Sequence, residues 1–252
     1  MEKISAQLFF QEGRKIIDRL EKEQMENIKK AARIMAKSIL NNGVIHIFGP
    51  GHSKSFAMEL VHRAGGLAPC SGIALDDLVT KAENPITYEE LRQPETERDP
   101  QTAHDLLNIH HIQPGDVMII CSNSGRNGSA VELALEIKKR GVPLIGVTSL
   151  AHSKKTESRH PSGKRLFEIA DTVIDNCGPY GDAAISLEAI DTKVCSVSSV
   201  SNMFIAQALT AETIKLILAE GEIPPVFVSL NVDGADEHNE KIKTRYEGRV
   251  HW

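Results

Sequence analysis

From residue 44 onward the chain alternates short apolar runs with amphipathic stretches, and this alternation limits its possible folds more than any other feature. The apolar runs have the length of strands, while the stretches between them repeat apolar residues at steps of three and four, as helices do. The runs lie at residues 44–48, 117–121, 144–149 and 171–175, with a weaker one at 73–75. Strands that alternate with helices form βαβ crossovers, and continuously apolar strands suit burial on both faces. The sequence therefore predicts an α/β fold, a three-layer sandwich with a mainly parallel sheet flanked by helices.

The segments on either side of this pattern are predicted to extend one central domain. Residues 2–40 have a helical period, either as one long helix or as two, and the tripeptide Asn41-Asn42-Gly43 ends it. We therefore expect an N-terminal helical extension at residues 1–42 and an α/β domain at 43–222. The remaining residues, 223–252, have no strong period, and we expect them to pack as a tail on the domain or on a partner subunit.

Two further segments complete this organisation. Residues 80–116 are polar and charged, and they predict an inserted segment with one short helix near 101–110. A final helix is expected at about 201–220.

Composition and charge exclude several classes of protein. The 252 residues are 41% hydrophobic and 25% charged, as in a globular protein with an ample core, and the net charge of −5 argues against a general nucleic-acid binder. The first residues lack the apolar core of a signal peptide, and no stretch is long enough to span a membrane. The four cysteines (Cys70, Cys121, Cys177 and Cys195) are far apart and predict reduced core thiols. We therefore expect a cytoplasmic protein that binds neither nucleic acid nor membrane.

The stretch CSNSGRNGS at residues 121–129 leaves a predicted buried strand and enters a predicted helix. In an open parallel sheet, ligands bind beyond the carboxyl ends of the strands, where such loops meet helix N-termini. Glycines let backbone N–H groups approach a ligand closely, hydroxyls donate hydrogen bonds, and the helix dipole favours an anion. These properties predict a phosphate-binding loop. A plain turn with an Asn or Ser cap is the alternative.

Two familiar nucleotide motifs do not fit these loops. The stretch at 121–129 lacks the Gly-Lys-Ser/Thr ending of a P-loop. After the strand at 44–48 the chain reads Gly49-Pro50-Gly51, but Lys54 stands where a dinucleotide-binding fingerprint has its third glycine. A nucleotide-binding enzyme is therefore disfavoured.

The stretch CSNSGRNGSAVELALEIKKRGVPLIGVTS resembles the core of the SIS (sugar isomerase) phosphosugar-binding domain, in which a Ser-x-Ser-Gly loop lies between a strand and a helix. HIFGPGHSKSFAMELV is similar to the first loop of that family, and EIADTVID to its Ala-Asp-x-Val strand. The resemblance covers roughly residues 35–220 and is closest to the stand-alone phosphosugar-binding subgroup. It implies a flavodoxin-like sheet, a phosphorylated sugar as ligand and no cofactor.

Carried over residue by residue, the resemblance implies a phosphate site made of Gly51, Ser53, Ser122, Ser124, Asn127 and Ser129. The family usually has Ser or Thr at the position of Asn127. An amide can also donate a hydrogen bond to phosphate, and Ser129 follows within the same helical turn.

The resemblance is incomplete at the catalytic positions. Isomerisation of a sugar phosphate needs a base that moves a proton between adjacent carbons. SIS isomerases commonly use a glutamate on the first helix and a histidine on the last. Here the first helix offers Glu59, the last predicted helix has no histidine, and His52 in the first loop is the substitute by position. Glu59 could equally be a surface or interface residue, and Glu188 and Asp191 are weaker acid candidates.

These observations predict a protein that binds a phosphorylated sugar or sugar derivative, as a phosphoheptose isomerase-like enzyme or an etherase-like lyase. The alternative is a non-catalytic phosphosugar sensor that acts through a protein partner. Direct control of DNA is disfavoured, because only about 40 residues precede the first strand, where SIS regulators carry a helix-turn-helix module of about 75 residues. The apolar faces of the N-terminal helix, together with the resemblance, predict a homodimer or homotetramer with sites near the subunit interface.

No metal site is predicted. The acidic stretch NVDGADEHNEK in the tail does not have the spacing of an EF-hand loop. His110-His111 has no second ligand pair nearby in the sequence and is read as the end of a loop.

Overall fold

The computed structural model describes residues 4–250 and is built around one five-stranded parallel sheet. The strand order is β2-β1-β3-β4-β5, and each neighbouring pair is parallel. The chain thus adds β2 on one side of β1 and β3 on the other, which is the flavodoxin-like order. The strands are β1 (Ile45–Phe48), β2 (Cys70–Ile73), β3 (Val117–Cys121), β4 (Leu144–Thr148) and β5 (Thr172–Asp175).

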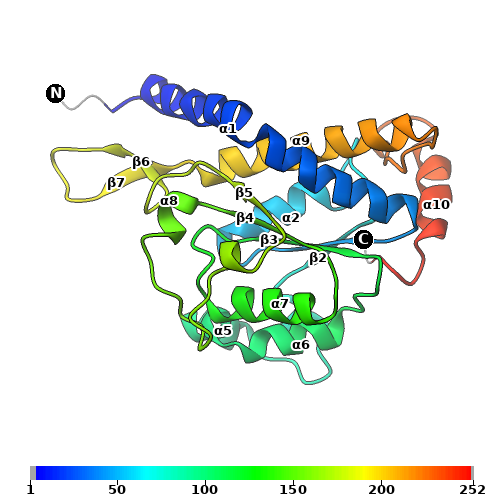
Figure 1. Cartoon of the computed structure of the whole chain (residues 1–252), viewed down its shortest axis with the longest axis horizontal. Coiled ribbons are helices and arrows are strands. Elements are labelled where there is room, and N and C mark those ends of the chain that lie inside the picture. Colours follow the sequence, from blue (N-terminus) through cyan, green and yellow to red (C-terminus); the bar gives the residue numbers. More distant parts are fainter. Residues whose placement is uncertain (1–3, 251–252) are drawn as a thin grey trace.

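Helices cover both faces of the sheet, so the predicted three-layer α/β sandwich is confirmed (Figure 1). Alternate strand residues enter two separate cores, with Ile47 and Ile119 on one face and Met118 and Ile120 on the other. The first face is covered by α1 (Ala6–Leu40), α2 (Lys54–Leu60) and α9 (Ser198–Ala219), and the second by α6 (Gln101–Ile109) and α7 (Gly128–Lys139).

The N-terminal helix α1 is a single helix of 35 residues, one of the two readings that its sequence allowed. The Ser5 hydroxyl caps it by accepting a hydrogen bond from the Leu8 N–H at 3.1 Å. Asn42, at φ 58°, ends it in the left-handed region that Asn tolerates better than most residues. The buried face of α1, which includes Leu20 and Met35, belongs to the same core as the sheet and α9.

The inserted segment contains more structure than the one helix that was predicted. Two short helices, α4 (Tyr88–Leu91) and α5 (Pro94–Arg98), precede α6 within it, and α3 (Asp77–Thr80) ends where it begins. Helices of four or five residues are too short to show a hydrophobic period. A capping box of Thr87 and Glu90 marks the start of α4, and Pro94 occupies the first turn of α5.

Beyond β5 the chain forms two elements that its sequence pattern did not indicate. Strands β6 (Ala183–Ser186) and β7 (Lys193–Ser196) form an antiparallel hairpin that extends away from the sheet (Figure 1), and its Cys195 is exposed, unlike the other three cysteines. In the tail, α10 (Ala235–Arg245) packs through Asn239, whose side-chain amide bonds both the N–H and the carbonyl of Val228.

The C-terminal residues are also tied to the sheet. The Arg249 guanidinium donates to the buried carboxylate of Asp116 at 2.6 Å. The same carboxylate accepts the Val44 N–H at 2.9 Å and contacts His46 Nε2 at 3.2 Å, so that one acid joins the tail to the start of β1.

A second buried acid, Asp77, joins the inserted segment to the domain. Its carboxylate contacts His110 Nε2 at 2.9 Å, accepts the Ala74 N–H at 2.8 Å and pairs with Lys81 at 2.9 Å. Burial opposes ionisation of Asp77, but the hydrogen bonds from His110, Ala74 and Lys81 outweigh it and lower its pKa to about 2. His110 is therefore a buried partner of Asp77.

We expect this acid to make stability depend on acidic pH. The pKa of Asp77 is lower in the folded chain than its ordinary value of 3.8, so its contribution is present above about pH 4 and is lost as the pH falls towards 2. Asp77→Asn should cost about 2 kcal/mol of unfolding free energy at pH 6, and this deficit should shrink as the pH falls towards 2. Urea unfolding of both proteins across this range measures the difference, and a deficit that stays constant with pH would contradict the assignment.

Candidate functional site

A cavity of about 300 Å³ lies where the strand order reverses, beyond the carboxyl ends of β1 and β3. This is the position at which open α/β sheets bind ligands, because loops that diverge from neighbouring strands leave a crevice between them. We call it the switch-point cavity. It is lined by Pro50, Gly51, His52, Ser53, Glu97, Ser122, Asn123, Ser124, His152, Asp182, Ser198 and Asn202.

The structure brings together most of the residues that the sequence singled out. Gly51, His52 and Ser53 after β1 face Ser122 and Ser124 after β3 across the cavity. Gly51 has a φ of 54°, which permits the tight turn from β1 into α2.

The loop after β3 is held in place by its neighbours. The carbonyl of Asn123 accepts the Ser149 N–H at 3.0 Å and the Thr148 hydroxyl at 3.1 Å. The Ser122 hydroxyl oxygen accepts the Gly125 N–H at 3.2 Å, which leaves its own proton free to be donated. The loop therefore presents a hydroxyl donor from a fixed backbone.

The loop after β1 approaches from the other side. A Cβ at Gly49 would lie 2.3 Å from the Ser53 carbonyl oxygen, so this loop closes on itself too tightly for a side chain. Beneath the two loops, burial raises the pKa of the Cys121 thiol to about 12, although a hydrogen bond with the Ser53 side chain opposes the rise. Cys121 is thus a protonated packing residue and not a nucleophile.

Three asparagines form an amide network along one wall of the cavity. The Asn176 amide nitrogen donates to Asn123 Oδ1 at 3.0 Å and to Asn202 Oδ1 at 3.2 Å, while Asn176 Oδ1 accepts the Gly178 N–H at 3.0 Å. Because Asn123 and Asn202 use their oxygens in this network, their NH₂ groups remain to donate to a ligand.

Glu97, from α5, brings a carboxylate to the cavity. Its Oε1 accepts a hydrogen bond from the Asn127 amide at 2.5 Å. Its Oε2 lies 3.9 Å from the position that a Cβ on Gly51 would occupy, so the second oxygen faces the loop after β1. One oxygen therefore holds the side chain in place while the other is directed across the cavity.

His152, from α8 (Leu150–Ser153), lines the cavity as a neutral side chain. Its Nδ1 accepts the Gly181 N–H at 3.1 Å, and since a backbone N–H can only donate, the ring proton is on Nε2. Burial and the nearby Arg126 charge lower the pKa of His152, and Asp182 opposes the shift. His152 is thus a hydrogen-bond donor at neutral pH.

Asp182 also lines the cavity, and both of its carboxylate oxygens accept hydrogen bonds. Its Oδ1 accepts the N–H groups of Val197 and Ser198, at 3.2 and 2.8 Å, and its Oδ2 accepts the Ser198 hydroxyl at 2.9 Å. Asp182 therefore holds the start of α9 against the cavity.

Three of the predicted site residues lie outside the lining of the cavity. Asn127 bonds Glu97 and accepts from Arg159 at 2.9 Å, so it acts on the cavity through Glu97. Ser129 is buried, and its hydroxyl has no hydrogen-bond partner among the described residues. Glu59 accepts from Gln207 at 2.7 Å and pairs with Arg63 at 3.0 Å, which links α2 to α9.

Several lining residues were not predicted from the sequence. His152 follows the carboxyl end of β4, so the rule that indicated the loops after β1 and β3 could have indicated it as well. Glu97, Asp182 and Asn202 lie on a short helix, beside the hairpin and on the final helix, where no local pattern distinguishes them from surface polar residues.

The sheet order and this cavity define an α/β protein with a polar ligand site at the topological switch point. The chain matches the model of the SIS domain over residues 8–149, and it belongs to that family. It is 39% identical over 246 residues to the UPF0309 protein of Caldanaerobacter subterraneus subsp. tengcongensis, covering 96% of this chain and 98% of that protein.

Two solved structures share the fold. A phosphoheptose isomerase from Neisseria gonorrhoeae is 17% identical with a TM-score of 0.50, covering 82% of this chain and 95% of that chain. A phosphoheptose isomerase from Francisella tularensis is 15% identical with a TM-score of 0.52, covering 84% of this chain and 100% of that chain. Separately, none of the helices described between residues 4 and 250 has the length and apolarity to cross a membrane.

Proposed function

We propose that this protein binds a phosphorylated sugar in the switch-point cavity and interconverts its aldose and ketose forms. The observation that carries the proposal is that hydroxyl and amide donors from several loops meet there beside one carboxylate with a free oxygen. The names of the two structural neighbours, both phosphoheptose isomerases, support it.

The phosphate group would bind between the two loops. Ser53 comes from one side and Ser122 and Ser124 from the other, and the cavity is wide enough for a sugar phosphate at about 300 Å³. Neutral hydroxyl donors are sufficient for this role, because the phosphate itself carries the charge. A hydrogen bond to a charged acceptor is about twice as strong as one between neutral groups.

The remaining polar groups would hold and activate the sugar. The NH₂ groups of Asn123 and Asn202 would donate to its hydroxyls, and His152 Nε2–H would donate to the carbonyl oxygen. Glu97 Oε2 would remove the proton from the carbon next to the carbonyl, giving an enediolate. After a hydroxyl proton has passed from one enediolate oxygen to the other, Glu97 would return its own proton to the former carbonyl carbon. A neutral histidine suits the donor role, since it polarises the carbonyl without adding a charge.

His52 is exposed beside Ser53, and we propose it as a second group that could move hydroxyl protons. Glu59 lies outside the cavity in this single chain, so a catalytic role for it would require the site to extend to the α2–α9 surface. Exposed apolar side chains on α1, α2 and α9 (Phe10, Met58 and Phe204) support our proposal of a homodimer or homotetramer.

The first experiment is a thermal-shift screen against pentose, hexose, heptose and amino-sugar phosphates, each beside its unphosphorylated form. A ligand that binds only the folded state raises the melting temperature as its concentration exceeds the dissociation constant. We expect one phosphosugar to stabilise the protein and its unphosphorylated form to have no effect.

Ser124→Ala should weaken that phosphosugar about 10- to 100-fold, because it removes a hydrogen bond to a charged group worth about 1.5–3 kcal/mol. Ser186→Ala, at an exposed serine on β6, is the matched control and should bind normally. Equal affinity in Ser124→Ala and wild type would contradict the phosphate site.

Turnover is then followed by NMR in D₂O, where isomerisation exchanges the carbon-bound proton for deuterium. Interconversion of the two sugar forms would support the enzyme. Binding without exchange would favour the phosphosugar sensor instead.

A further inference from the structure

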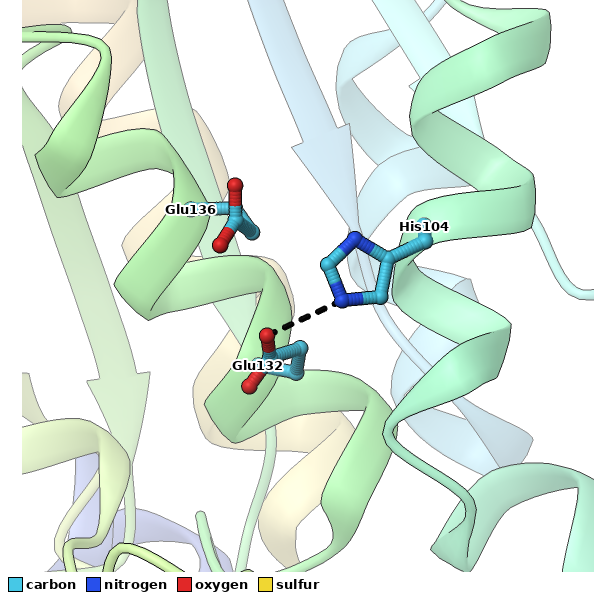
Figure 2. A group of neighbouring side chains, drawn as sticks. All are labelled: His104, Glu132 and Glu136. Atoms are coloured by element: carbon cyan, nitrogen blue, oxygen red, sulfur yellow. Dashed lines mark ion pairs between the residues drawn. The ribbon is translucent and has the colours of Figure 1, made fainter.

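Away from the cavity, three potential metal ligands meet between α6 and α7. Figure 2 shows the His104 imidazole of α6 directed at α7, where Glu132 and Glu136 lie one turn apart. His104 Nε2 is 3.0 Å from Glu132 Oε1, and one ligand atom of each residue lies within 4.8 Å of the other two. None of the three lines the switch-point cavity.

A fourth residue, His160, holds Glu132 in position. The Ser162 N–H donates to His160 Nδ1 at 3.1 Å, so the ring proton must be on Nε2. That nitrogen lies 2.6 Å from Glu132 Oε2, to which it donates a hydrogen bond. Glu132 therefore keeps its other oxygen, Oε1, directed towards His104. Carboxylates that bind metal ions are commonly held by hydrogen bonds from neighbouring groups.

We propose that His104, Glu132 and Glu136 bind one divalent transition-metal ion of the zinc type, with His160 positioning Glu132. Zinc accepts imidazole nitrogen and carboxylate oxygen at about 2.0–2.2 Å, which places ligand atoms roughly 3–3.5 Å apart. The three ligand atoms reach that spacing by small side-chain movements. The His104 side chain is 41% exposed, so water can fill the fourth position.

Charge at the site also favours a cation. The two carboxylates would balance the two charges of the ion, and Lys139, which pairs with Glu136 Oε1 at 2.5 Å, is the nearest competing cation. Lys139 donates to Glu136 Oε1, so Oε2 of the same carboxylate is left for the ion. The Lys139 side chain is itself largely exposed. The charge of Arg140 acts on Glu136 as well and would compete weakly.

Magnesium fits less well. It prefers six oxygen ligands in a near-ideal octahedron, whereas imidazole suits zinc and its neighbours in the transition series.

The ion would connect two segments that carry the proposed reaction site. Glu97 shortly precedes α6, and the N-terminus of α7 follows the loop of Ser122 and Ser124. Metal binding would therefore stiffen the layer that holds these groups without contacting the sugar.

The test titrates metal-stripped protein with Zn²⁺ and, separately, with Mg²⁺ by calorimetry, in a Cys195→Ser background that removes the exposed thiol. We expect one Zn²⁺ per chain at micromolar or tighter affinity, a raised melting temperature and no comparable response to Mg²⁺. His104→Ala and Glu136→Gln should each weaken Zn²⁺ at least tenfold, and His160→Gln should weaken it 10- to 100-fold through Glu132.

His111→Ala is the matched control, since it removes an exposed histidine close to the end of α6 and should leave Zn²⁺ binding unchanged. Circular dichroism of the metal-free variants checks that each one folds. The proposal is overturned if folded His104→Ala and Glu136→Gln bind Zn²⁺ as tightly as their parent, or if the parent binds no Zn²⁺ at about 100 µM. These results do not depend on sugar binding, so failure here leaves the proposed function intact.

Discussion

Glu97→Gln is expected to reduce the turnover of the phosphosugar about 10²- to 10⁴-fold, the usual contribution of a positioned base. Glutamine keeps a carbonyl oxygen that can accept the Asn127 amide, so the side chain should stay in place while its basic oxygen is lost. The dissociation constant of the phosphosugar should change only a few-fold, since the phosphate binds to the two serine loops. The measurement is the rate of deuterium exchange at the reacting carbon, together with the affinity from thermal shift.

Glu95→Gln provides the control for this variant. Glu95 lies on the same short helix, α5, and is exposed, so its replacement should leave both rate and affinity unchanged. Exchange by Glu97→Gln within threefold of wild type would show that another group is the base, with His52 the next to be tested.

Gly128→Ala is expected to lower the free energy of unfolding by about 1–3 kcal/mol or more. A Cβ at Gly128 would lie 1.9 Å from the Arg98 carbonyl oxygen and 2.8 Å from the Pro100 nitrogen. These are backbone atoms, so the clash cannot be relieved by a change of rotamer. Because Arg98 directly follows Glu97, the displaced backbone should also weaken the phosphosugar response. Urea unfolding and the thermal-shift screen measure the two effects.

A second glycine supplies the contrast. Gly13 lies inside α1, where a Cβ would have no atom within 4 Å, and Gly13→Ala should stabilise the protein by about 0.5–1 kcal/mol through helix propensity alone. If Gly128→Ala were as stable as wild type, the close approach of α5 to α7 would not be what requires a glycine at position 128.

The elements that have a distinct hydrophobic pattern were predictable from the sequence. The four apolar runs of strand length became β1, β3, β4 and β5, because a buried strand needs apolar side chains on both of its faces. The short helices α3, α4 and α5 and the hairpin of β6 and β7 gave no such signal. The helices are too short to show a hydrophobic period, and the strands of the hairpin lack an apolar run because most of their residues are not buried.

The candidate site divides in the same way. The serine loops after β1 and β3 could be identified in advance, because loops at the carboxyl ends of neighbouring parallel strands meet at one edge of the sheet. The presence of Glu97 opposite Gly51, and the contact of His104 and His160 with one glutamate, could not. The sequence by itself determined the α/β class and the hydroxyl-rich edge of the sheet, because both follow from local pattern. Only the tertiary structure decided which acid and which histidines complete the sites, because packing alone brings residues about 30 positions apart to within hydrogen-bonding distance.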